Sequence, residues 1–194
     1  MTAETAGAAM SVNGIVTGRI GVGKTTVCQQ VIALARQRGH IVHGLLTPAI
    51  IGPDGLKVGI SITDLSTGRS RTLARIEQDG AGLPVGKYTF DPTVLRWGCA
   101  ALERAAEGGC DLLLVDEIGP LELLRGQGFV RAVEILGAGI LPHTLLVVRE
   151  SLLEAIRARA GGAPLLEFQV SEQNRDHVAA EIVDRLFARP VAEK

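Results

Sequence analysis

The stretch that decides the fold reads Gly18-Arg19-Ile20-Gly21-Val22-Gly23-Lys24-Thr25. It fits the phosphate-loop pattern, in which glycines let the backbone curl so that its N–H groups face anionic oxygens at the start of a helix. The Lys24 ammonium would reach the β- and γ-phosphates, the Thr25 hydroxyl would coordinate Mg²⁺, and the Thr26 hydroxyl would add to the α-phosphate. Residues 18–26 therefore predict a binding site for a nucleoside triphosphate with Mg²⁺.

The segments around this loop occur in the order that such a site requires. Residues 13–17 read as a short apolar strand, and residues 25–38 repeat apolar side chains at helical spacing with basic residues at the end. Further strands are predicted over 41–47, 112–115, 144–148 and 165–170, and further helices over 91–107, 121–136, 152–159 and 173–188. Alternating strands and helices are typical of a parallel sheet covered on both faces, with ligands bound along the edge where the strands end.

An antiparallel addition is predicted between the second strand and the helix over 91–107. Turn residues at 51–55 lead into a strand over 56–65, and a second turn at 66–68 leads into residues 69–76. Residues 77–84 read as a loop and 86–90 as a short strand. We therefore expect an α/β three-layer sandwich with a mostly parallel central sheet and an added antiparallel hairpin. It would form one domain over 11–190, after a disordered tail over 1–10.

Composition excludes several classes of protein. The chain has 194 residues and a formal net charge of -1, which gives no general attraction to nucleic acid or to an anionic membrane. No segment approaches the ~20 apolar residues of a membrane span, and the first ten residues lack a signal-peptide pattern. The three cysteines, Cys28, Cys99 and Cys110, have no metal-type spacing and predict a reducing, cytoplasmic setting.

A second motif follows the apolar run Leu112–Val115. A Mg²⁺-nucleotide site needs an acidic group at the end of a buried strand, and Asp116 meets this requirement. We expect Asp116 to hold the metal, through water. Glu117 follows directly and is placed to orient an attacking water as a general base.

At this point the chain resembles a known family, the THEP1-type nucleoside triphosphatases, which are P-loop NTPases. The matching segments are Gly18–Thr26, Gly44–Thr47, Gly59–Asp64, Val85–Phe90, Asp116–Glu122 and Glu172–Arg175. The resemblance implies Mg²⁺-dependent hydrolysis of ATP, GTP and other nucleoside triphosphates to diphosphate and phosphate, with weak base selectivity. It also implies that Lys24 and Thr25 bind phosphate and metal, Asp116 the metal, and Glu117 the water.

Two features of the site stay open at the level of sequence. Asn174 and Arg175 follow the last strand, where a base or ribose would lie, but they equally fit a helix cap and a solvated arginine. Catalysis of phosphoryl transfer gains from a cation at the γ-phosphate. Four arginines are candidates for this role, and the sequence selects none of them: Arg19, Arg125, Arg131 and Arg149.

Three other functions share parts of these motifs. Asp116–Gly119 also matches the Asp-x-x-Gly of signalling GTPases, but the guanine-reading Asn-Lys-x-Asp segment is absent. A nucleotide or cofactor kinase would have a similar fold and would differ only in the phosphate acceptor. In a nucleotide-gated binding module, the bound nucleotide and its slow hydrolysis would control contact with a partner, and residues 56–75 would be the contact surface.

Overall fold

The fold was analysed in a computed structural model, which describes residues 11–76, 82–161 and 164–188. The strands are β1 (Val12–Thr17), β2 (Val42–Leu46), β3 (Ala49–Ile51), β4 (Lys57–Asp64), β5 (Ser70–Ile76), β6 (Leu83–Val85), β7 (Tyr88–Phe90), β8 (Leu112–Ile118), β9 (His143–Val148) and β10 (Leu165–Gln169). The helices are α1 (Lys24–Gln37), α2 (Pro92–Gly108), α3 (Pro120–Leu123), α4 (Val130–Ala138), η1 (Glu150–Leu152, a 3₁₀ turn), α5 (Leu153–Arg157) and α6 (Val178–Leu186).

All of these strands join one sheet, in the order β10-β1-β9-β8-β2-β4-β5-β7-β6, with β3 paired to β4. The strands from β10 to β2 run parallel, and the pairing turns antiparallel from β2 to β4 onward. β8 lies between β9 and β2, as its uninterrupted apolar run predicts for a strand that is buried on both faces.

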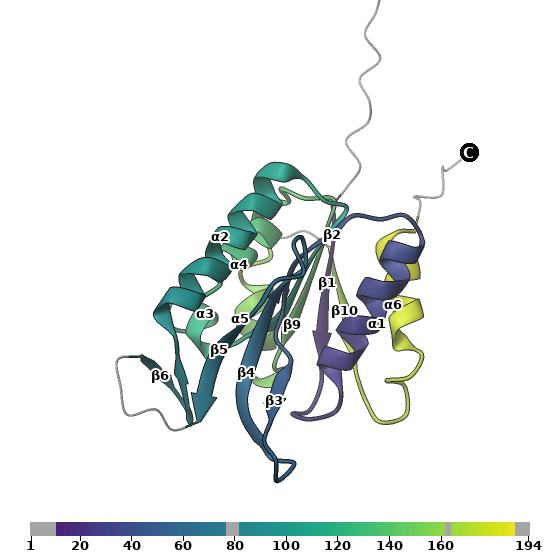
Figure 1. Ribbon diagram of the computed structural model, residues 1–194. Helices are drawn as coiled ribbons and strands as arrows, with labels where there is room; N and C mark the ends of the chain where they lie inside the picture. The colour runs from purple at the N-terminus through teal and green to yellow at the C-terminus, as the bar shows by residue number, and fades with distance from the viewer. Residues whose placement is uncertain (1–10, 77–81, 162–163, 189–194) are drawn as a thin grey trace, which may run out of the picture.

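Helices cover both faces of the parallel half of the sheet (Figure 1). Alternate residues of β8 point to opposite faces, so Leu112 and Leu114 pack with α1 and α6, while Leu113 and Val115 pack with α2 and α4. The three-layer α/β fold and the mostly parallel sheet are thereby confirmed. The single-domain boundaries over 11–190 stay a prediction, and the predicted tail over 1–10 lies outside the described residues.

The antiparallel part is larger than the predicted hairpin. The turns at 51–55 and 66–68 form as expected, between β3 and β4 and between β4 and β5. The predicted loop over 77–84 is wrong at its end, because Leu83–Val85 forms β6 and pairs with β7. The rest of that loop, residues 77–81, lies outside the described residues.

Three predicted helices needed correction. The helix over 121–136 is interrupted between α3 and α4, where Gly126 and Gly128 adopt left-handed φ angles of 63° and 71°. The helix over 152–159 begins as a 3₁₀ turn and ends earlier, at Arg157, and the Ser151 side chain does not cap it. The helix over 173–188 begins only at Val178, because turns occupy residues 172–177.

Two further findings bear on the cellular setting. No helix in the described ranges is long and apolar enough to cross a membrane. All three cysteines are free thiols, and burial raises the pKa of Cys28 well above its ordinary value and that of Cys110 to about 11. These thiols behave as small core side chains, and the cytoplasmic location stays a prediction.

Candidate nucleotide site

The phosphate loop links β1 to α1 at the carboxyl edge of the parallel strands (Figure 1). Gly18 has a φ of 143°, and a Cβ there would lie 2.5 Å from the Val170 carbonyl oxygen, so only glycine fits between the loop and the end of β10. Gly23 has a φ of 108° and precedes the first residue of α1, where the free N–H groups of the helix begin. These backbone angles fit a phosphate loop, and anion binding by its N–H groups stays a prediction.

Lys24 spans this loop with its side chain. The ammonium donates hydrogen bonds to the carbonyl oxygens of Gly18, at 2.7 Å, and Arg19, at 2.8 Å. Burial lowers the Lys24 pKa, while attraction from Glu117 and Asp116 opposes the shift. The ammonium is therefore already held over the cradle, within the field of both predicted carboxylates.

Asp116 is the most deeply buried carboxylate of the site, with 2% of its surface exposed. One carboxylate oxygen accepts a hydrogen bond from the Thr47 N–H at 3.3 Å, and the Thr47 hydroxyl donates to the Asp116 carbonyl oxygen at 2.7 Å. Burial raises the Asp116 pKa to about 6, although hydrogen bonds from Thr25 and Thr47 oppose the shift. Thr47 is a site residue that sequence reasoning missed, although its place at the end of a buried strand beside Pro48 was a usable signal.

Glu117 owes its orientation to a β-bulge. Val115 pairs with Leu146 and Ile118 with Val148, so Asp116 and Glu117 together oppose a single residue of β9. Among the described residues Glu117 is the only non-glycine with a positive φ, 77°. In a regular strand neighbouring side chains point to opposite faces, and the extra residue of a bulge interrupts this alternation at Asp116 and Glu117. Backbone strain of this kind is characteristic of functional sites.

Glu122, which belongs to the same motif, stabilises the local fold. Its side chain accepts hydrogen bonds from the N–H groups of Gly119, at 2.9 Å, and Phe129, at 3.1 Å. A Cβ at Gly128 would lie 2.3 Å from one Glu122 oxygen, which explains why glycine stands there and why the predicted long helix breaks. These two hydrogen bonds therefore hold the segment that follows Glu117 in place.

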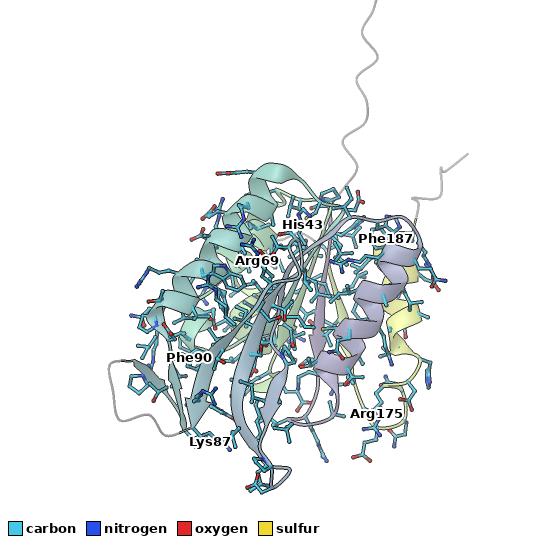
Figure 2. The ribbon with its side chains drawn as sticks, in the orientation of Figure 1. His43, Arg69, Lys87, Phe90, Arg175 and Phe187 are labelled. Carbon is cyan, nitrogen blue, oxygen red and sulfur yellow. The ribbon has the colours of Figure 1, made fainter. Side chains whose placement is uncertain are left out.

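Arg175 lies beside the phosphate loop, in the turns that follow β10. A pocket of about 190 Å³ is lined by Gly23, Thr26, Arg175 and Asp176, and Figure 2 shows Arg175 at the sheet edge where α1 begins. Asn174 instead holds the turn itself, because it donates to the Gln169 carbonyl oxygen and accepts from the Ser171 N–H, both at 2.8 Å. The structure therefore separates the two residues, with Arg175 at the pocket and Asn174 in the turn.

Two of the other arginine candidates lie in different surroundings. Arg131 pairs with Glu103 and Glu134, which places it between α2 and α4. Arg125 lies 3.5 Å from the Pro84 carbonyl oxygen, beside β6. Arg149 is the candidate that contacts a predicted catalytic residue, since it forms an ion pair with Glu117.

The oxygen atoms available at the site decide which metal it could hold. Among the described residues no group of three or more His, Cys, Asp or Glu side chains could hold a metal by itself. The Thr25 hydroxyl beside the Asp116 carboxylate supplies hard oxygen ligands, and Mg²⁺ in nucleotide sites takes its remaining ligands from phosphates and water. These residues fit Mg²⁺ bound together with a nucleotide.

Fold and site together define a P-loop protein of the α/β class. The model of the NTPase family matches residues 13–183. The chain is 32% identical over 176 residues to the nucleoside-triphosphatase THEP1 of Methanopyrus kandleri, covering 90% of this chain and 95% of the relative. It is 36% identical over 169 residues to the protein of the same name from Archaeoglobus fulgidus, covering 86% and 94%.

A solved structure agrees in fold. The crystal structure of THEP1 from the hyperthermophile Aquifex aeolicus matches with a TM-score of 0.70 and 21% identity, covering 91% of this chain and 99% of that one. The chain belongs to the NTPase family, and the resemblance drawn from its motifs is confirmed.

Burial of Asp116 leads to a prediction about stability. A raised pKa in the folded state means that its contribution to stability is fully present below the ordinary pKa of 3.8 and is lost as pH rises through about 6. The substitution Asp116→Asn removes this titration, and an amide can still accept from the Thr47 N–H. We expect Asp116→Asn to raise the unfolding free energy by about 1–3 kcal/mol at pH 7.5 in chelator.

Urea denaturation at pH 7.5 and pH 4.5 measures this effect. The gain should shrink at pH 4.5, because more of the wild-type Asp116 is then neutral. If Asp116→Asn is less stable than the wild-type chain at pH 7.5, the hydrogen bonds from Thr25 and Thr47 outweigh the cost of burial.

Proposed function

We propose that this chain hydrolyses nucleoside triphosphates to the diphosphate and phosphate with Mg²⁺ and with weak base selectivity. The observation that carries the proposal is the acidic bulge at the end of β8, where buried Asp116 accepts hydrogen bonds from Thr25 of the phosphate loop and from Thr47, and Glu117 follows it directly. Family membership and the names of the relatives support the same activity. The roles of Asp116 as metal ligand and of Glu117 as general base are part of this proposal, and this geometry supports them.

Each site residue has its own role in the proposed reaction. Backbone N–H groups of residues 18–26 and the Lys24 ammonium bind the phosphate oxygens, and Thr25 and Asp116, the latter through water, would hold Mg²⁺. When bound, the metal neutralises charge on the phosphate oxygens. Glu117 accepts a proton from water as the water oxygen bonds to the γ-phosphorus. The bond to the bridging oxygen breaks, and its electron pair leaves with the diphosphate.

Phosphate release from ATP, GTP, CTP and UTP tests this proposal. The purified chain should release phosphate from all four with Mg²⁺ and no added acceptor, and should stop in chelator. Release that requires a small-molecule acceptor would instead favour the kinase alternative. A nucleotide-dependent protein partner with negligible phosphate release would favour the binding module.

Arg175 is proposed to contact the base or ribose. The pocket that it lines also includes Gly23 and Thr26 of the phosphate loop, so a nucleotide bound at the loop would lie within reach of Arg175. We expect Arg175→Ala to weaken diphosphate and triphosphate binding alike by about fivefold to tenfold, or about 1–1.4 kcal/mol. Arg38→Ala, which removes an arginine paired with Asp184 between α1 and α6, is the control.

Equilibrium titration of both variants with ADP and GDP measures the effect. An Arg175→Ala chain with unchanged affinity would leave Arg175 as a solvated side chain. Equal losses for the two diphosphates would support contact with the ribose, whereas unequal losses would support contact with the base.

A further inference from the structure

Arg149 lies at the carboxyl end of β9, the strand between β1, which precedes the phosphate loop, and β8, which carries the acidic bulge of Asp116 and Glu117. Its backbone is extended, with φ -67° and ψ 144°, and its carbonyl oxygen accepts the Leu152 N–H at 2.9 Å as η1 begins. The backbone of Arg149 is thus hydrogen-bonded to the start of η1, while its side chain pairs with Glu117.

The side chain is paired with the predicted base. Arg149 Nε donates to Glu117 Oε1 at 2.8 Å, and a second guanidinium nitrogen donates to the same oxygen. Both side chains keep contact with solvent, with exposed fractions of 43% for Arg149 and 35% for Glu117. Pairs of this exposure typically contribute only ~1 kcal/mol or less, so a stronger anion can replace the carboxylate.

Charge balance also favours such an exchange. Lys24 and Arg149 supply two positive charges, and three carboxylates, those of Asp116, Glu117 and Glu150, act on the Lys24 ammonium together with the guanidinium. A triphosphate brings further negative charge to the cradle. A guanidinium bonds phosphate oxygens through two parallel N–H groups, a geometry that a single carboxylate oxygen does not offer.

We propose that Arg149 leaves Glu117 when a triphosphate binds and contacts the γ-phosphate, where it stabilises the charge of the transition state. This inference rests on the proposed hydrolysis. The same movement releases Glu117 to accept the proton of the attacking water, so the base becomes available only when the substrate is present. The stabilising arginine comes from the chain itself, and hydrolysis then needs no partner protein.

The binding test compares ADP with a nonhydrolysable ATP analogue, which differ in the γ-phosphate. In the wild-type chain the analogue should bind more tightly in the presence of Mg²⁺. Arg149→Ala should weaken analogue binding by about tenfold and change ADP binding by less than about twofold, because only the analogue offers the contact. Arg157→Ala is the matched control, since Arg157 has a similar exposed fraction, 42%, and pairs with Glu154 and Glu167 on the surface.

The kinetic test measures single-turnover phosphate release from ATP. Arg149→Ala should slow release by about 10²-fold or more, whereas Arg157→Ala should match the wild-type chain. Arg149→Lys keeps the charge but not the paired N–H groups; it should bind the analogue better than Arg149→Ala and still be slow. If Arg149→Ala fails to fold, analogue binding and phosphate release are both measured on Arg149→Lys.

Each outcome decides the proposal. Unchanged analogue affinity in Arg149→Ala overturns it, even if turnover falls, because Arg149 would then act only by positioning Glu117. Unchanged turnover overturns it as well. A wild-type chain that binds the analogue without releasing phosphate would reject the proposed hydrolysis, while the comparison of analogue with ADP would still test the contact. Failure to bind either nucleotide would overturn both proposals.

Discussion

The substitution Lys24→Ala should abolish tight binding of nucleoside triphosphates. The ammonium lies over the cradle, bonded to the carbonyl oxygens of Gly18 and Arg19, and a bound phosphate would take the place of these acceptors. Without it, the negative charge of the phosphates near Asp116 and Glu117 would lose the lysine that the loop itself supplies. Removal of one partner of a charged contact in a binding site typically costs about 2–5 kcal/mol, so we expect affinity to fall by about 30-fold to 4000-fold.

Calorimetric titration with an ATP analogue and Mg²⁺ measures this loss. Lys57→Ala is the control, because it also removes one lysine, from β4, where Lys57 lies over the Tyr88 ring. Circular dichroism would establish that both variants fold. Lys24→Ala with wild-type affinity would contradict the site as described here.

The substitution Glu117→Gln should separate binding from catalysis. Gln has nearly the same shape, and its amide oxygen can still accept the hydrogen bonds from Arg149. It cannot take a proton from water at neutral pH, and loss of a general base typically costs 10²-fold to 10⁴-fold in rate. We therefore expect analogue affinity within about threefold of wild type and turnover reduced by about 10² or more.

Phosphate release and analogue titration on the same preparation distinguish the two effects. Glu103→Gln is the matched control, since Glu103 is likewise a partly exposed carboxylate paired with an arginine, Arg131. Wild-type turnover in Glu117→Gln would leave Glu117 with a structural role at the bulge. A parallel loss of affinity and turnover would instead point to a role in binding nucleotide.

Sequence reasoning failed where distant contacts override local preference. Apolar spacing predicted a helix through Gly126 and Gly128, but Glu122 accepts the Phe129 N–H and leaves no room for a side chain at Gly128. Similarly, apolar spacing predicted a helix from residue 173 onward. Residues 172–177 instead form turns, which hydrogen bonds of the Asn174 side chain stabilise. Residues 83–85 looked like loop because their strand character depends on pairing with β7.

The sequence by itself determined the phosphate loop, the α/β class and the acidic pair, because glycine spacing and uninterrupted apolar runs act locally. Tertiary structure decided how these parts work together. The order of β1, β9 and β8 brings Arg149 to Glu117, and the bulge places Asp116 and Glu117 together opposite one residue of β9. Such contacts depend on strand order and register, which join residues 32 positions apart in the Arg149–Glu117 pair and bring Asp116 to the loop that lies 92 positions before it, so they leave no local pattern in the chain.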